Sequence, residues 1–227
     1  MKKALNTAGH AVGRRRVARL MREEGLRGRP TRRFRGNTTD SRHDQPVAPN
    51  LLARNFTTEA PNIAWVGDIT YLWTASGWCY LAVLLDLFSR KVVGWALDTH
   101  MRDDLCLDAL HQAVTLRNPP PGLLHHTDRG SQYASHAYQK ALADLGARPS
   151  MSRKGNCWDN ACAESFFGTL KQELGADTNW ADVHEARRAV GEYLHHFYNP
   201  VRLHSTLGHQ SPIAFETSYR EQLSQAA

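Results

Sequence analysis

The 227-residue sequence has few cysteines, no long hydrophobic run and no leader of the secretory kind. Its four cysteines are scattered, and Cys157 and Cys162 have no second pair at zinc-finger spacing. This pattern argues against a disulfide framework and against a structural zinc site. The longest apolar run, residues 79–85, is far shorter than the roughly 18 residues that a membrane span needs. No apolar stretch of the signal-peptide kind follows Met1. We therefore expect a cytoplasmic protein without a membrane partner.

Basic residues are concentrated near the N-terminus. Residues 1–60 hold 14 Lys and Arg against 5 Asp and Glu, whereas the rest of the chain holds 14 against 17. A basic arm is typical of proteins that contact nucleic-acid phosphates, because each neutralised phosphate releases bound counterions. A solvated surface or a solubility tail would have the same composition, so charge alone leaves both interpretations open.

The basic arm divides into a helix and a linker. Residues 12–26 have the periodicity of a helix with a narrow apolar side and a basic side. The apolar side carries Val17, Leu20 and Met21, and the basic side carries Arg15, Arg19 and Arg22. Such a helix needs helical partners, and few residues precede it, so we interpret residues 1–28 as a partial helical DNA-binding region. Residues 29–60 have neither helical nor strand periodicity and are predicted to be a basic linker.

Residues 61–175 carry the pattern of an α/β domain. Three apolar strands come first, and helix, strand, helix, strand and helix follow. This order predicts a mixed five-stranded sheet with helices on both faces. The predicted strands are 63–73, 78–87, 92–97, 123–126 and 147–151, and the predicted helices are 103–117, 135–146 and 160–174. Residues 176–227 are predicted to form a helical C-terminal extension, with a long helix over 181–197 and a short one that begins at Ser211-Pro212.

Three carboxylates are candidates for a metal-dependent active site. Asp68 lies in the first apolar strand, Asp128 directly follows the fourth, and Glu164 lies on the helix over 160–174. A lone Glu on a helix is usually a solvated surface residue. Glu164 is a candidate because the sequence also contains Asp68 and Asp128. Carboxylate oxygens are the ligands that Mg²⁺ prefers, and two such ions can assist both oxygens of a phosphoryl displacement.

Two other aspartates have structural rather than catalytic explanations. Asp86 competes with Asp68 because it also follows apolar strand residues. Its position two residues before Phe88 favours a hydrogen-bonding role in a turn, and antiparallel pairing should keep it away from the middle of the first strand. Asp159 precedes a helix where an N-cap residue belongs, so its carboxylate has a structural explanation.

Several neighbouring residues have two interpretations each. His125 and His126 could indicate a softer metal, but one of two adjacent strand residues must point away from any site. We interpret His125 as a packing residue and leave His126 open. Arg129 either binds phosphate or braces its loop. Arg202 and His204 either touch DNA or tie their segment to the core.

Five motifs follow one another along the chain. They are Trp65-Val66-x-Asp68-Ile69-Thr70-Tyr71, Leu85-Asp86-Leu87-Phe88-Ser89-Arg90, His126-Thr127-Asp128-Arg129-Gly130-Ser131-Gln132-Tyr133, Asn156-Cys157-Trp158-Asp159-Asn160-Ala161-x-Ala163-Glu164-Ser165-Phe166-Phe167 and Tyr198-Asn199-x-x-Arg202-x-His204-x-x-Leu207-Gly208. In this order, over about residues 10–218, they resemble the catalytic protein of the two-frame bacterial insertion sequences. The 35 residues between Asp128 and Glu164, with Lys171 seven further on, resemble the three-carboxylate core of retroviral integrases and insertion-sequence transposases. Gly67 departs from the family pattern, which usually has Thr there, and the N-terminal helical region looks incomplete.

The resemblance implies a ribonuclease-H-like catalytic core that transposes DNA. It implies two Mg²⁺ ions, or Mn²⁺ in their place, with Asp68 between them and Asp128 and Glu164 each at one ion. Water would first expose a 3′-OH at the element's end, and that 3′-OH would then attack another DNA strand. Lys171, Asn160 and Arg129 are predicted DNA contacts. The implied partners are insertion-sequence ends, target DNA, further copies of the chain in a homo-oligomer and an upstream-frame protein, at the bacterial nucleoid.

Two alternatives stay open at this point. A nuclease of the same fold would hydrolyse DNA without joining it. A truncated, non-catalytic remnant would bind DNA or inhibit transposition.

Overall fold

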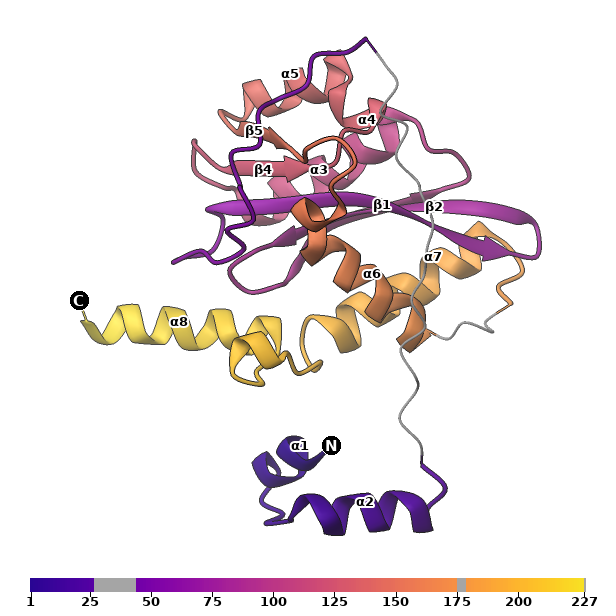
Figure 1. The fold of residues 1–227 in the computed structure, drawn as a ribbon, viewed down its shortest axis with the longest axis vertical. Coiled ribbons are helices and arrows are strands. Elements are labelled where there is room, and N and C mark those ends of the chain that lie inside the picture. Colours follow the sequence, from indigo (N-terminus) through magenta and orange to yellow (C-terminus); the bar gives the residue numbers. More distant parts are fainter. Residues whose placement is uncertain (27–43, 175–178, 227) are drawn as a thin grey trace.

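A mixed five-stranded sheet forms the centre of the fold in the computed structural model, which describes residues 1–26, 44–174 and 179–226 (Figure 1). The strands are β1 (Ala64–Thr74), β2 (Gly77–Asp86), β3 (Val92–Asp98), β4 (Leu124–Thr127) and β5 (Arg148–Met151). Their order in the sheet is β3-β2-β1-β4-β5. The first three strands form an antiparallel meander, and β4 and β5 continue the sheet in parallel with β1. The predicted sheet is therefore confirmed.

Helices cover both faces of the sheet, because the side chains of its central strands alternate between two hydrophobic clusters. On one face lie α3 (Asp103–Arg117), α4 (Ser131–Ala134) and α5 (His136–Asp144). On the other lie α6 (Ala161–Leu174) and α7 (Val183–Glu192). The bounds of α3 match the prediction, with Asp103 and Asp104 in the first turn and the prolines from Pro119 onward beyond its end.

The C-terminal extension packs back onto the sheet. Helix α7 continues into a π-helix, η2 (Tyr193–Tyr198), and a short 3₁₀ turn, η3 (Ser205–Leu207), leads to α8 (Pro212–Ala226). Helix α8 is longer than the short helix predicted there, and its far end extends away from the sheet (Figure 1). Asn199 follows η2 and bonds both the N–H and the carbonyl of Val92 on β3, at 3.0 and 3.1 Å.

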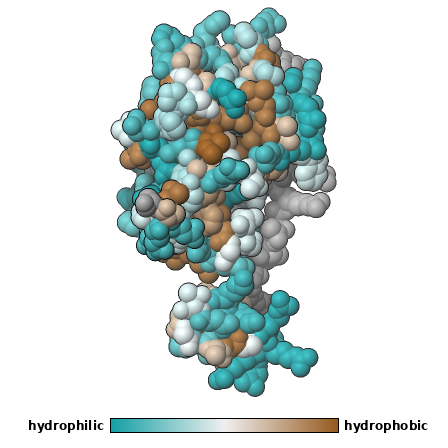
Figure 2. Space-filling model, turned by 90° about the vertical axis from the view of Figure 1, so that its left-hand side faces the viewer, coloured by the Kyte–Doolittle hydropathy of each residue, from teal (hydrophilic) through white to brown (hydrophobic). Residues whose placement is uncertain are grey.

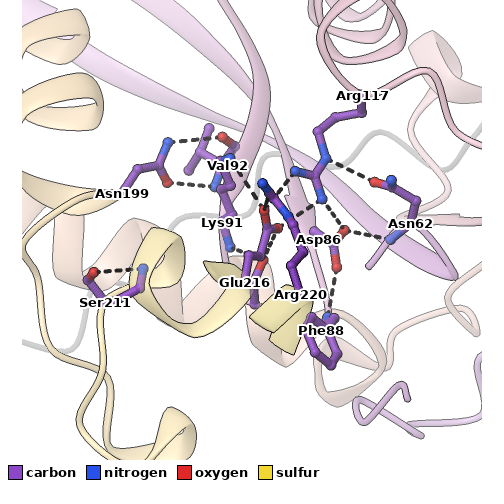
Figure 3. A network of polar contacts seen from close by, with 12 residues as sticks. Asn62, Asp86, Phe88, Lys91, Val92, Arg117, Asn199, Ser211, Glu216 and Arg220 are labelled. Atoms are coloured by element: carbon purple, nitrogen blue, oxygen red, sulfur yellow. Dashed lines mark hydrogen bonds and ion pairs between the residues drawn. The ribbon is translucent and has the colours of Figure 1, made fainter. Parts of the chain in front are cut away.

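A buried ionic network fastens α8 to the sheet (Figure 3). Arg117, at the end of α3, donates to both carboxylate oxygens of Glu216 at 2.8 Å and to Asp86 at 3.3 Å. Asp86 and Glu216 are 0% and 1% exposed. Burial acts to raise the pKa of Glu216, but the hydrogen bonds and charge of Arg117 hold it below its ordinary value. For Asp86 burial prevails and the pKa is raised.

The position of Asp86 confirms its predicted turn role. Its carboxylate accepts from the backbone N–H groups of Asn62 and Phe88, both at 2.8 Å. In the β1–β2 register Asp86 lies opposite Trp65, whereas Asp68 lies opposite Val83. Asp86 therefore lies opposite the start of β1, three residues before the position of Asp68.

The N-terminal residues form a small helical unit with α1 (Lys2–Thr7) and α2 (Arg14–Glu23). Helix α2 corresponds to the predicted helix, and α1 was not predicted. Figure 2 shows this unit, below the core, as a largely hydrophilic surface. The Val17 side chain is buried, and the arginines of α2 are exposed. No helix in the described part of the chain is long and apolar enough to cross a membrane.

Part of the segment predicted to be a linker lies on the core. The backbone N–H groups of Leu51 and Leu52 donate to the Ser150 hydroxyl at 2.9 and 3.2 Å, and the Leu52 side chain is buried. Leu52 is an apolar residue within a polar segment, so its burial has a simple physical cause, whereas the neighbouring Leu51 side chain stays 48% exposed. Residues 29–43 of the predicted linker lie outside the described residues.

Candidate active site

Asp68 and Asp128 lie at corresponding places on neighbouring parallel strands. β4 pairs with β1 over three residues, and the last pair is Val66 with His126. Asp68 and Asp128 each follow that pair by two positions. Because parallel strands present equivalent positions side by side, the register brings both carboxylates to the point where β4 ends and β1 continues.

Backbone N–H groups orient both of these carboxylates. Oδ1 of Asp68 accepts from the N–H of Ile69 at 2.8 Å, and Oδ1 of Asp128 accepts from the N–H of Gly130 at 2.8 Å. Glu164 lies in the first turn of α6, on a side of the helix that is exposed. The opposite side of α6 carries Phe166 and Leu170 into the core.

The negative charges of Asp128 and Glu164 both act on the Asp68 carboxylate. The pKa of Asp68 is raised well above its ordinary value, first by burial, then by the negative charge of Asp128 and also by that of Glu164. The Ile69 N–H and the positive charge of Lys171 act in the opposite direction. Partial burial raises the pKa of Glu164 as well. Asp128 and Glu164 are therefore near enough to Asp68 to act on its charge, and the metal-binding role of the three residues stays a prediction.

Carboxylate oxygens are the ligands that divalent cations such as Mg²⁺ prefer, and a bound cation would reduce the repulsion between the three negative charges. The chemistry of this set therefore fits such an ion. Its geometry does not form a closed ligand set. Among the described residues, no group of three or more His, Cys, Asp or Glu side chains stands close enough together to hold a metal ion. Joint ligation by all three carboxylates would require their side chains to move together.

Asn160 has a different position from the one predicted. It ends the 3₁₀ helix η1 (Cys157–Asn160), is 4% exposed, and donates from Nδ2 to the carbonyl of Gly67 at 3.2 Å. This burial and the bond to β1 give Asn160 a positioning role in the structure, and its contact with DNA stays a prediction. Asn160 ties the start of α6 to the strand that carries Asp68.

Gly67 lies in a closely packed part of the sheet. A Cβ atom at this position would lie 2.8 Å from Cδ2 of Leu84 and 3.3 Å from Cγ2 of Thr127. Thr127 precedes Asp128, so a larger residue at Gly67 would press on the loop of the second carboxylate. The departure from the family pattern thus coincides with a tight local fit.

Of the predicted DNA contacts, Arg129 follows Asp128 in the chain, and the charge of Lys171 acts on Asp68. Arg129 donates through Nε to the carbonyl of Ser152, which braces the loop after β4. Lys171 places its ammonium 4.5 Å from the centre of the Tyr71 ring. Burial lowers the pKa of Lys171 to about 8, and the charge of Asp68 opposes this shift.

Of the three α2 arginines predicted to contact DNA, Arg19 forms an ion pair with Glu23 at 3.5 Å. Arg15 and Arg22 are exposed beside Arg19 on α2.

The two adjacent histidines are buried and hydrogen-bonded. His125 pairs through Nε2 with the hydroxyl of Tyr138 at 2.8 Å, in agreement with its predicted packing role. His126, which the sequence left open, lies between the hydroxyls of Ser150 and Ser152 at 2.8 and 3.2 Å. Burial lowers the pKa of His125 to about 3 and that of His126 to about 4, so both rings are neutral near pH 7.

Asp159 is not the N-cap that was predicted, because it lies within η1 and the donors to its carboxylate come from the segment before β1 and the loop after β5 rather than from α6. It is 0% exposed and accepts from Asn50 at 2.9 Å, from Arg54 at 2.8 Å and from the backbone and side chain of Arg153 at 2.8 to 3.0 Å. It joins the segment before β1 to the loop after β5, directly before Asn160. Sequence reasoning missed this because Asn50 and Arg54 are 109 and 105 residues away.

We expect Asp159→Asn to lower the free energy of unfolding by about 2–4 kcal/mol at pH 7, because it removes a charged acceptor of several hydrogen bonds. The hydrogen bonds and charge of Arg153 hold the pKa of Asp159 well below its ordinary value. A depressed pKa in the folded state contributes stability above about pH 4, and this contribution is lost as the pH falls further. Urea unfolding at pH 7 and at pH 3 should show the gap between variant and wild type narrowing at pH 3. A gap that widens there would contradict this assignment.

The mixed sheet, with one carboxylate on its central strand, a second after the neighbouring parallel strand and a third on the helix that covers it, defines the ribonuclease-H-like integrase cores. The chain has the same fold as the catalytic core domain of human T-cell lymphotropic virus 2 integrase, with a TM-score of 0.55 and 19% identity over 70% of this chain and 98% of that one. Two family profiles described as integrase core domains match residues 58–157 and 145–212, and a profile described as an HTH-like domain matches residues 1–34.

Relatives from insertion sequences match nearly the whole chain. A 31 kDa protein of insertion element IS600 from Shigella sonnei is 46% identical over 94% of this chain and 78% of its own length. The transposase of IS904 from Lactococcus lactis is 42% identical over 94% of this chain and 84% of its own length. The chain belongs to the transposases of bacterial insertion sequences, enzymes with an integrase core.

Proposed function

We propose that the chain cleaves DNA at insertion-sequence ends and joins the resulting 3′-OH to target DNA in a reaction that needs Mg²⁺, or Mn²⁺ in its place. The observation that carries this proposal is that the negative charges of Asp128 and Glu164 both act on Asp68. Burial raises the pKa of Asp68, and the charges of Asp128 and Glu164, which come from two other parts of the fold, raise it further. Similarity to an integrase core whose structure contains magnesium supports the proposal.

Asp68, Asp128 and Glu164 are the residues that would hold the metal. When bound, divalent ions supply Lewis-acid activation of the attacking oxygen and stabilisation of the leaving one. The N–H groups of Ile69 and Gly130 fix one oxygen of Asp68 and of Asp128. Lys171 supplies positive charge beside them for the phosphates of the substrate.

The purified chain should convert labelled insertion-end DNA to a nicked product and then to a product joined to a second DNA, with Mg²⁺ and not with EDTA. Joining separates a transposase from a nuclease of the same fold. Metal-dependent nicking without any joined product would support the nuclease, and neither product in Mg²⁺ or Mn²⁺ would refute the proposal.

We also propose that the chain acts as a homo-oligomer on DNA at the nucleoid, with the upstream-frame protein of the same element as a partner. Joining an element to a target requires two element ends and a target to be held at once. A match of residues 1–34 to an HTH-like domain supports DNA contact by the N-terminal unit.

The triple substitution of Arg15, Arg19 and Arg22 by Ala should weaken DNA binding and flatten its salt dependence. The slope of log K against log salt is negative, and each lost phosphate contact reduces its magnitude by about 0.9, so the loss of three contacts reduces it by about 2.7. Fluorescence anisotropy over a salt series measures the slope. A matched control replaces three exposed cations of the core, Arg102, Lys140 and Arg188, with Ala. An unchanged slope in the α2 variant would mean that these arginines do not contact DNA.

A further inference from the structure

Three aromatic side chains gather at the far end of the β1–β2 hairpin, and we call Tyr71, Trp73 and Trp78 the aromatic platform. Trp73 and Trp78 are cross-strand partners, with ring centres 4.8 Å apart, and the Tyr71 and Trp78 rings meet edge to face at 5.0 Å. The two tryptophans remain 51% and 50% exposed. Exposed tryptophans held in a fixed cluster are unusual on a soluble protein and typically mark a binding surface.

The aromatic platform is continuous with the candidate active site. Tyr71 and Trp73 follow Asp68 on the same strand, about 10 and 17 Å away at the usual rise of a strand. Lys171 bridges the two places. Its ammonium lies 4.5 Å from the centre of the Tyr71 ring, and its charge interacts with the carboxylate of Asp68.

The edge of β1 connects the two faces on which these groups lie. Alternation along the strand places Asp68 on one face of the sheet and Tyr71 and Trp73 on the other. β4 pairs only with Ala64, Trp65 and Val66, so beyond Val66 this edge of β1 carries no further strand pairing among the described residues until the isolated bridge between Thr74 and Trp180. No neighbouring strand of the described residues therefore separates the carboxylates from the platform along this edge.

We propose that the aromatic platform stacks unpaired bases of the DNA strand whose phosphate lies at the carboxylates. The proposal rests on the proposed function and names the form of its substrate: the bases next to the reacting phosphate are held out of the duplex. Every base has a flat apolar face, whereas a paired duplex presents its phosphates and groove edges outward. Lys171 adds a positive charge for the phosphate between the carboxylates and the first stacked base.

Binding to three DNAs tests the proposal without any cleavage. The full chain is titrated in EDTA against a blunt duplex, the same duplex with a short single-stranded 3′ overhang, and that overhang without its bases. We expect the overhang to bind about tenfold more tightly than the blunt or the abasic DNA, which corresponds to about one stacked base. Quenching of 2-aminopurine placed in the overhang should report the stacking directly.

Variants identify the residues responsible. Trp73→Ala with Trp78→Ala should abolish the preference for the overhang and the quenching, while Trp73→Phe with Trp78→Phe should retain both. Phe197→Ala removes an exposed aromatic outside the platform and should behave as wild type. These readouts do not depend on catalysis, so a chain that stacks bases but never cleaves would refute only the proposed function.

Two results would overturn the stacking proposal. One is an overhang preference that survives in the double Ala variant. The other is that the wild-type protein shows no overhang preference, while its self-association, measured by analytical ultracentrifugation, is lost in the double Ala variant. The platform would then be covered by a second copy of the chain.

Discussion

Asp68→Asn, Asp128→Asn and Glu164→Gln are each expected to slow cleavage and strand transfer by about 10³-fold or more. Each removes a charged ligand from a set that is proposed to hold divalent ions. Loss of metal activation removes several kcal/mol of transition-state stabilisation, and each 1.36 kcal/mol is a factor of ten in rate. Single-turnover assays with saturating Mg²⁺ measure the loss. Asp144→Asn, an exposed carboxylate paired with Lys140, should react at the wild-type rate.

The stability of Asp68→Asn separates lost chemistry from lost structure. An acid whose pKa is raised in the folded state destabilises that state at any pH above the raised value, because its charged form is disfavoured there. Removing the charge should leave the metal-free protein at pH 7 at least as stable as wild type. Added Mg²⁺ should raise the melting temperature of wild type more than that of the variant. An active Asp68→Asn protein, or one that unfolds at a much lower temperature, would remove Asp68 from the proposed site.

Arg117→Met is expected to destabilise the protein by about 3–5 kcal/mol, because it leaves two buried carboxylates without their shared cation. Asp86 and Glu216 face each other through Arg117, which is itself only 10% exposed. The variant should recover part of its stability as the pH falls, since protonation removes the charge of Asp86, whereas Glu216 keeps its ion pairs with Lys91 and Arg220. Urea unfolding at pH 7 and pH 5 measures both effects.

Arg102→Met provides the control for this substitution. Arg102 also pairs with an aspartate, but its side chain is 66% exposed, and its replacement should change the free energy of unfolding by less than about 0.5 kcal/mol. If Arg117→Met and Arg102→Met cost the same, the buried network does not hold α8 to the sheet.

The order of strands and helices could be predicted from the sequence because each element carries its own signal. The helix over 103–117 has acidic residues in its first turn and prolines after its last, so both ends are marked locally. Asp86 could be assigned for the same reason, since the turn that it serves begins two residues later. Local chemistry alone was enough for these features.

Contacts between distant residues could not be predicted in this way. Asp159 binds Asn50 and Arg54 from a segment that reads as a linker, and Asn160 is buried because β1 passes over η1. Nothing within a few residues of either position signals these partners. The same holds for Glu216, whose carboxylate looks like any solvated helix residue until the fold brings Arg117 to it.

The burial of Glu216 also sets an order of events during synthesis. Asp86 and Arg117 are translated first, and the carboxylate that completes their network comes 99 residues after Arg117. Until α8 has left the ribosome, Arg117 has only Asp86 of the two carboxylates available, and the loop that must close is long. The sheet can assemble earlier, but the nascent chain gains its last buried ion pair only when this final helix folds back onto it.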